Sequence, residues 1–132
     1  MGITIRLVDA EFCIKKINQK FALKALKEYA KTSLYTDKEG IDKLRHLNDV
    51  FKLFCYYIEY DDDTDDVNDI NFEGEKLADD YEMLCSIAPF VEAGSYIEIS
   101  ADENSSWRWF FDGKSCTEIY PTITWKMPGA QP

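Results

Sequence analysis

The chain has 132 residues, of which 45% are apolar and 14% aromatic, and its formal net charge is −10. This length allows one domain with a real hydrophobic core, and the aromatic content excludes a disordered chain. No stretch approaches the roughly 18 apolar residues of a membrane span, and no apolar run typical of a signal peptide opens the sequence. We therefore expect a cytoplasmic protein with a single domain over residues 1–125 and a C-terminal tail over 126–132.

The negative charge is concentrated in the second half of the chain. Residues 1–60 hold 11 Lys and Arg against 8 Asp and Glu, a balance of +3, whereas residues 61–132 hold 4 against 17, a balance of −13. Such a surface repels phosphates, which disfavours nucleic acid as a partner, and it attracts cationic proteins. A simpler interpretation is that the acidity only keeps an aromatic-rich protein soluble.

Extended and helical patterns alternate along the first two thirds. The segments 3–7 and 12–14 are candidate strands, and Asn18 is a candidate N-cap for an amphipathic helix with its apolar face between Phe21 and Ala30. Apolar residues at helical spacing predict a second helix over 41–51. The segments 53–60 and 68–72 predict a hairpin with an acidic tip at 61–66. Helical spacing returns over 76–91, where Pro89 ends or kinks the helix.

The last third predicts a β-meander with one preferred register. A loop over 101–105 would pair Ile99 with Trp107, Ile97 with Trp109 and Glu98 with Arg108, so that apolar faces and charges both match. The Asp-Gly pair at 112–113 favours the next turn, and a loop of about three residues would place Glu118 beside Arg108. The third strand would then direct four residues to the core: Ile119, Pro121, Ile123 and Trp125. Its mid-strand proline indicates an edge strand.

The resulting order β-α-α-β-β-α-β-β-β predicts an α+β fold, an antiparallel sheet with helices packed on one face. Without the extra helix and the terminal hairpin, the order is β-α-β-β-α-β. This is the split β-α-β arrangement of ferredoxin-like domains, here with an added C-terminal hairpin or meander.

Cysteine and histidine positions indicate no metal site. The four cysteines lie 30 or more residues apart, and one histidine cannot complete a zinc site. Apolar neighbours indicate reduced core thiols at all four positions, which are Cys13, Cys55, Cys85 and Cys116. His46 stands beside Arg45 on the second expected helix, and no motif places a nucleophile or carboxylate next to it.

The acidic run from Asp61 to Asp66 departs from an EF-hand loop. Neither reading frame places a glycine at the sharp turn that such a loop requires. The run is interpreted as a solvated hairpin tip, with a docking loop for a basic partner and loose binding of divalent cations as alternatives.

The Trp107-Arg108-Trp109 segment has two interpretations. Exposed tryptophans around an arginine are typical of a protein-binding hot spot. Alternatively, both tryptophans lie in the core and Arg108 bridges Glu98 and Glu118 on the outer face of the sheet. The register favours the second interpretation, which also places Tyr96 and Phe110 beside Arg108.

A resemblance covers roughly the last third of the chain. Gly94-Ser-Tyr-Ile-Glu98 followed by Trp107-Arg-Trp-Phe-Phe-Asp-Gly113 resembles a signature of small uncharacterised bacterial proteins, with weaker similarity over 72–89. No activity is attached to that family, so the resemblance implies a stand-alone bacterial protein and no mechanism. In size and charge alone, the chain is similar in character to bacterial immunity proteins and phage inhibitors.

We therefore expect a non-catalytic acidic protein-binding module, of the immunity or inhibitor kind, that engages a basic partner protein without a cofactor or metal. The expected contact residues are Asp61, Asp62, Asp63, Asp65, Asp66, Tyr96, Glu98, Arg108 and Phe110. One alternative is a small enzyme that uses His46 and carboxylates in a cleft. Another is a structural subunit of a phage or larger complex, and the oligomeric state stays open.

Overall fold

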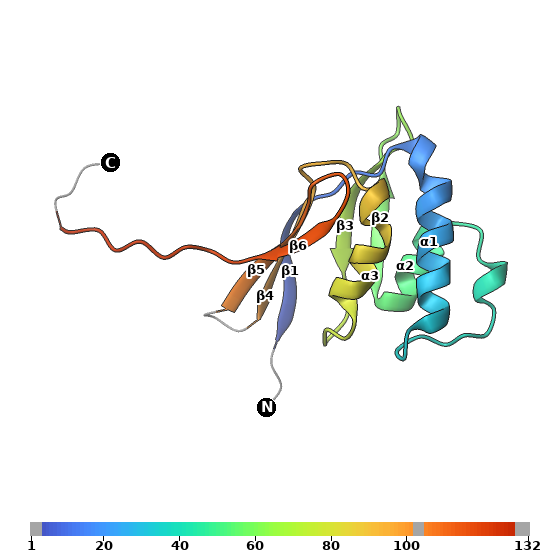
Figure 1. Ribbon diagram of the computed structural model, residues 1–132, viewed down its shortest axis with the longest axis horizontal. Coiled ribbons are helices and arrows are strands. Elements are labelled where there is room, and N and C mark those ends of the chain that lie inside the picture. Colours follow the sequence, from blue (N-terminus) through green and yellow to red (C-terminus); the bar gives the residue numbers. More distant parts are fainter. Residues whose placement is uncertain (1–3, 102–104, 129–132) are drawn as a thin grey trace.

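A computed structural model describes residues 4–101 and 105–128. The expected α+β class is confirmed (Figure 1). The helices in the described residues are α1 (Gln19–Thr32), α2 (Leu47–Phe51) and α3 (Asp80–Ile87), and the strands are β1 (Ile5–Glu11), β2 (Tyr56–Tyr60), β3 (Val67–Phe72), β4 (Tyr96–Ala101), β5 (Ser105–Phe111) and β6 (Cys116–Ile119). Residues 1–3, which include the first residue of the expected strand 3–7, lie outside the described residues, as do 102–104 of the expected loop and 129–132 of the expected tail.

The strands form an antiparallel four-stranded sheet in the order β1-β4-β5-β6 and a two-stranded sheet of β2 and β3. Just after β1, Ile14 pairs with Val67 at the start of β3 through two backbone hydrogen bonds of 3.1 and 2.9 Å. The neighbours β2, β3, β1 and β4 thus follow the order of the split β-α-β arrangement, although a single bridge joins its two halves. The three helices lie on one side of the strands (Figure 1).

The core lies between the strands and the helix layer. Helix α1 buries Ala22, Leu26 and Ala30, which are one turn apart on one face. Phe12 follows β1 and contacts Phe51 of α2 and Phe111 of β5 edge to face, with ring centroids 6.2 and 5.7 Å apart. This aromatic contact connects the four-stranded sheet to the helices.

The second expected helix is wrong as a continuous element. A 3-10 turn at Ile41–Lys43 and the short α2 are separated by extended backbone at Leu44 and His46. The Lys27 side chain of α1 donates hydrogen bonds to the carbonyls of Asp42 and Leu44, at 3.0 and 2.8 Å. These carbonyls are therefore satisfied from α1, so a continuous helix is not needed to pair them.

The other helix ends differ less from expectation. Asn18 does precede α1, but its side chain makes no capping hydrogen bond. Phe21, expected on the apolar face of α1, is 47% exposed and stacks on Phe90. Helix α3 begins at Asp80, four residues after the expected start, and Pro89 lies in the 3-10 turn that follows it.

The predicted register of β4 and β5 is confirmed. Ile99 pairs with Trp107, Ile97 with Trp109 and Glu98 with Arg108. The side chains therefore alternate as expected: Ile97, Ile99 and Trp109 are buried, whereas Arg108 and Phe110 are exposed on the outer face, the side of the sheet away from the helices.

The predicted register of β5 and β6 is wrong by one residue. Arg108 pairs with Ile119 and Trp109 with Glu118, because the turn between the strands has four residues, 112–115. The Asp112 carboxylate accepts hydrogen bonds from the backbone N–H groups of Lys114 and Ser115 at 2.8 and 2.7 Å, which stabilises this longer turn. A one-residue slip exchanges the two faces of a strand.

Glu118 consequently lies on the face expected for Ile119. Its carboxylate accepts a hydrogen bond of 2.9 Å from the Trp109 indole and takes no part in the predicted bridge to Arg108. Ile119, Ile123 and Trp125, expected in the core, are 40%, 77% and 91% exposed.

Strand β6 is an edge strand, as predicted, and it ends at Ile119. The N–H of Phe111 bonds to Ser95 beside β4, so the even-numbered residues of β5 direct their backbone groups toward β6. In the same register Pro121 would lie opposite Ser106 and would have to donate an N–H that proline lacks. The chain therefore leaves the sheet after β6.

Candidate functional site

The acidic loop 61–66 is an ordered turn at the tip of the β2–β3 hairpin. One carboxylate oxygen of Asp61 accepts hydrogen bonds from the N–H groups of Asp63 and Thr64 at 2.8 and 3.0 Å. These bonds favour the ionised carboxylate and lower the pKa of Asp61. Asp65 adopts a left-handed conformation with φ of 61°, which closes the turn.

The far side of this loop is tied to the start of α1. Asp66 accepts a hydrogen bond of 2.7 Å from the N–H of Lys16 and forms an ion pair of 3.7 Å with Lys15. Asp65 forms an ion pair of 3.3 Å with Lys16, and its carbonyl accepts a hydrogen bond from Gln19 at 2.8 Å. Of the five expected contact residues in the loop, three are engaged within the chain, and Asp62 and Asp63 project into solvent.

No group of three or more His, Cys, Asp or Glu side chains in residues 4–101 and 105–128 is arranged to hold a metal ion. The carboxylates of Asp65 and Asp66 face lysines instead. The loop is thus a hairpin tip held by contacts to Lys15 and Lys16, and the carboxylates of Asp62 and Asp63 have no ion pair with the described residues.

The second predicted group of contact residues lies together on the outer face of β4 and β5. Arg108 forms an ion pair with Glu98 at 2.7 Å, and its guanidinium lies 4.2 Å from the ring centroid of Tyr96. The Tyr96 hydroxyl donates a hydrogen bond of 2.7 Å to Asp9 of β1. The bond to Glu98 raises the pKa of Arg108, and the bond to Asp9 raises the pKa of Tyr96.

We call Asp9, Tyr96, Glu98, Arg108 and Phe110 the outer-face patch. Phe110 is 37% exposed and pairs with Tyr96 across the strands. The helices lie on the opposite side of the strands, so no helix covers this patch (Figure 1). The four residues that sequence predicted here are brought together by the confirmed β4–β5 register.

Asp9 is the member of the patch that sequence reasoning missed. It lies in the charged segment between the two candidate strands, which the structure includes in β1. The ladder to β4 shifts between Leu7 and Asp9, so that Leu7 pairs with Ile99 and Asp9 with Glu98. This bulge turns Asp9 to the outer face, and no sequence pattern marks its position.

A shallow hollow of about 290 Å³ borders the patch at the β6 side. Its lining residues are Glu98, Ser106, Trp107, Arg108, Ile119, Tyr120 and Pro121. In the described residues, no hydrogen bond or ion pair connects the patch to the acidic loop, so the two predicted groups form separate surfaces.

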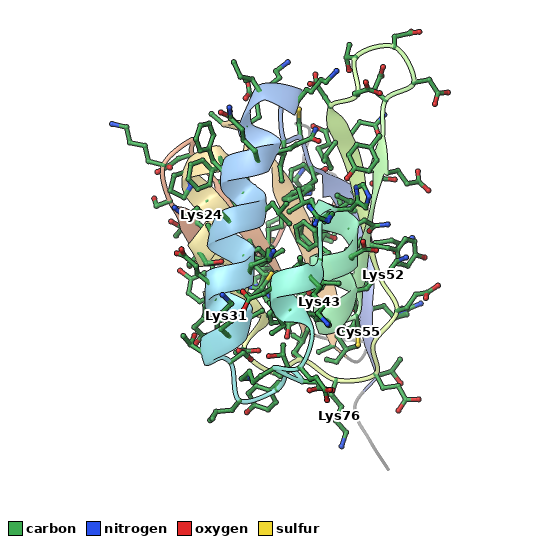
Figure 2. All side chains as sticks on the ribbon, turned by 90° about the vertical axis from the view of Figure 1, so that its right-hand side faces the viewer. Lys24, Lys31, Lys43, Lys52, Cys55 and Lys76 are labelled. Carbon is green, nitrogen blue, oxygen red and sulfur yellow. The ribbon has the colours of Figure 1, made fainter. Side chains whose placement is uncertain are left out.

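Positive charge gathers on the side of the molecule opposite the patch. Figure 2 views the helix layer and shows Lys24 and Lys31 along α1, with Lys43 and Lys52 beside α2. These side chains are exposed, and Lys31 forms an ion pair with Asp42. Because the cations gather on this helix face, the excess negative charge falls on the rest of the surface.

The residues of the alternative catalytic hypothesis are not brought together. His46 is exposed just before α2, and no hydrogen bond or ion pair of its side chain is found within the described residues. All four cysteines are free thiols.

The expectation of core thiols holds for Cys116, whose pKa is raised to about 12 by burial. Cys13 and Cys85 are half-buried. Cys55 is exposed, contrary to expectation, because a left-handed turn with φ of 67° precedes β2 there.

No family model, curated protein or solved structure matches the chain. None of the helices in the described part of the chain has the length and hydropathy that a membrane crossing needs.

Proposed function

We propose that the protein is a non-catalytic binding module that presents its outer-face patch to a basic partner protein. The observation that carries this proposal is the open sheet face on which an arginine, two carboxylates and a tyrosine ring are already held by one another, with Phe110 opposite the tyrosine. Arginine and tyrosine are enriched at the centres of protein interfaces. Side chains ordered before binding lose less conformational entropy when a partner arrives.

The backbone under the patch is equally fixed. On the reverse side of the same strands, Ile97, Ile99 and Trp109 are buried in the core. A surface held from beneath keeps its shape in the free protein, which favours binding without rearrangement.

Charge determines the kind of partner. The protein carries a net charge of −10, and Lys24, Lys31, Lys43 and Lys52 lie exposed on the helix face. A cationic protein is therefore steered toward the sheet side and the hairpin tip, where Asp62 and Asp63 are free to add contacts. Small acidic immunity and inhibitor proteins of bacterial cytoplasm are the class whose character this arrangement matches best.

The test is affinity capture from a lysate of the organism that encodes the chain, at salt of about 0.05 M and about 0.5 M. The bait is the wild-type protein or Phe110→Lys, which places a cation in the patch without touching the core. We expect one predominant basic protein to be captured at low salt, to be reduced at high salt and to be lost with Phe110→Lys.

Leu34→Lys is the matched control, because it makes the same apolar-to-cationic change at a residue that is 93% exposed and outside the patch. This variant should capture the partner as the wild type does. Capture that is unchanged by Phe110→Lys, or a captured protein that is acidic, contradicts the proposal.

A further inference from the structure

The segment that follows β6 carries several large apolar side chains that are exposed to solvent. We call residues 120–128 the arm; it runs away from the body of the molecule (Figure 1). Tyr120, Ile123, Trp125 and Met127 of the arm are 66%, 77%, 91% and 78% exposed. Large apolar side chains that gather on one exposed segment are typical of an interaction surface.

The arm has the sequence pattern of a β-strand. Pro121, Ile123, Trp125 and Met127 alternate with Thr122, Thr124 and Lys126, which gives one apolar and one polar side. If the arm continued the register of β6, its apolar side would join the outer face beside Ile119 and away from the core. The core of its own chain therefore cannot cover it.

A complementary surface lies at the opposite end of β5 from Phe110. Strand β5 begins at Ser105, but β6 pairs only with residues from Arg108 onward, so residues 105–107 have no strand partner on that side within the described part of the chain. Two hollows flank this end, of about 290 and 480 Å³, and both are lined by Ser106, Trp107 and Tyr120. The Trp107 indole N–H is buried there without an acceptor among the described residues.

The charges of the two surfaces are complementary. In the described arm the only charged side chain is Lys126. The larger hollow is bordered by the carboxylate of Glu118, whereas Glu98 in the smaller hollow is already paired with Arg108. An arm whose charged side chain is a lysine is therefore attracted to this end of β5.

We propose that two copies of this chain form a two-fold dimer by exchanging arms, each arm lying along residues 105–107 of β5 in the other copy. The chain's own arm cannot reach this position in register, because Pro121 ends the ladder opposite Ser106. The arm of a second copy is not constrained by the register of β6. It can therefore place residues 122–126, which contain no proline, beside residues 105–107 of β5. Both halves of the interface are present on one chain, so two copies related by a two-fold axis can exchange arms reciprocally and close the assembly.

The area is sufficient for a stable dimer. Within residues 122–126, the exposed side chains of Ile123 and Trp125 give each arm on the order of 300 Å² of surface to bury. Two arms and the surfaces they cover then bury on the order of 1,200 Å², which is the lower end of the range for specific protein interfaces.

This dimer does not depend on the proposed function, but its arm would lie beside Glu98 and Arg108 of the outer-face patch, which line one of the two hollows. Tyr96 and Phe110 lie at one end of the β4–β5 ladder, and Ala101 and Ser105 lie at the other. The exchanged arm occupies the Ser105 end and leaves Tyr96 and Phe110 open to a partner protein.

The first test is the molar mass of the purified protein, measured by light scattering after gel filtration over a range of concentrations. We expect about twice the chain mass of 15.3 kDa. The double variant Ile123→Asp/Trp125→Asp should be monomeric, whereas the matched control Leu34→Asp/Tyr35→Asp, at residues 93% and 65% exposed, should stay dimeric. A monomeric wild type, a polymer, or a dimer that survives the arm variant overturns the proposal.

The second test locates the arm. Trp125 is replaced by the photo-cross-linker benzoylphenylalanine, and copies of natural and heavy nitrogen isotope content are mixed before irradiation. Cross-links between light and heavy chains should map to residues 105–107 and their neighbours in β6. Cross-links confined within one chain, or directed to the helix layer, overturn the exchange even if the protein is dimeric.

Discussion

The buried hydrogen bond between Tyr56 and Asp80 allows the sharpest prediction about stability. Tyr56 of β2 is fully buried, and its hydroxyl donates a bond of 2.7 Å to one carboxylate oxygen of Asp80. The other oxygen accepts a bond of 2.8 Å from the N–H of Ala78. Tyr56→Phe removes the first donor without opening a cavity larger than one oxygen atom.

A hydrogen bond to a charged group stabilises a protein by about 1.5–3 kcal/mol, so Tyr56→Phe should lower the free energy of unfolding by that amount near neutral pH. For a chain of this length the midpoint temperature should fall by about 5–15 °C. Burial already raises the pKa of Asp80. Losing the Tyr56 donor raises this pKa further, because the ionised form loses part of its support.

The pH dependence follows from the direction of that shift. The folded protein binds the Asp80 proton more tightly than the unfolded chain, so the contribution of this group is most favourable below the unfolded pKa and is lost as pH rises through the folded pKa. The difference between Tyr56→Phe and the wild type should therefore be smaller in mild acid than at neutral pH.

Urea unfolding followed by tryptophan fluorescence, at neutral pH and at about pH 4.5, measures both effects. Tyr60→Phe is the control, since Tyr60 is 39% exposed and no hydrogen bond of its side chain is found in the described residues; it should change stability by less than about 0.5 kcal/mol. A Tyr56→Phe protein as stable as the wild type, or one destabilised equally at both pH values, would refute this reasoning.

Three further predictions concern the meander and the thiols. Gly113 has a φ of 96° in the turn before β6, so Gly113→Ala should cost about 1–2 kcal/mol in urea unfolding, and an unchanged midpoint would count against this turn. Trp109→Phe leaves a cavity and removes the donor to Glu118, so it should cost about 2–4 kcal/mol in the same assay, and a loss below about 1 kcal/mol would contradict the burial of the indole. A thiol reagent such as iodoacetamide at pH 8 should modify Cys55 first and Cys116 last. The reason is that Cys55 is exposed, whereas the pKa of the buried Cys116 is raised to about 12. Peptide mapping that finds Cys116 modified first would contradict this order.

The β4–β5 ladder shows which parts of the fold could be predicted from the sequence. Its register is favoured twice, once by the apolar residues opposite Trp107 and Trp109 and once by the charges of Glu98 and Arg108. A slip would lose both kinds of pairing, so the pattern alone specifies the register.

The β5–β6 register had no such support. It depended on a turn length, and the Asp112 side chain stabilises a four-residue turn that apolar alternation does not reveal. The same limit applies to the second expected helix, where Lys27 of α1 donates hydrogen bonds to the carbonyls of Asp42 and Leu44. In both places a polar side chain satisfies backbone groups in place of regular structure.

The candidate site was predictable to the same extent. Four members of the outer-face patch followed from the β4–β5 register, whereas Asp9 depended on a bulge in β1. The acidic loop was recognised as a hairpin tip. Its ties to Lys15 and Lys16 are contacts about 50 residues apart in sequence, which no local pattern contains.

The most direct measurement of the central claim is a nuclear magnetic resonance titration of the labelled protein with the captured basic partner. We predict that the largest chemical shift changes fall on Tyr96, Arg108 and Phe110, with small changes on α1. Changes concentrated around Lys24 and Lys31 on the helix layer, with the β4–β5 face unaffected, would contradict the account.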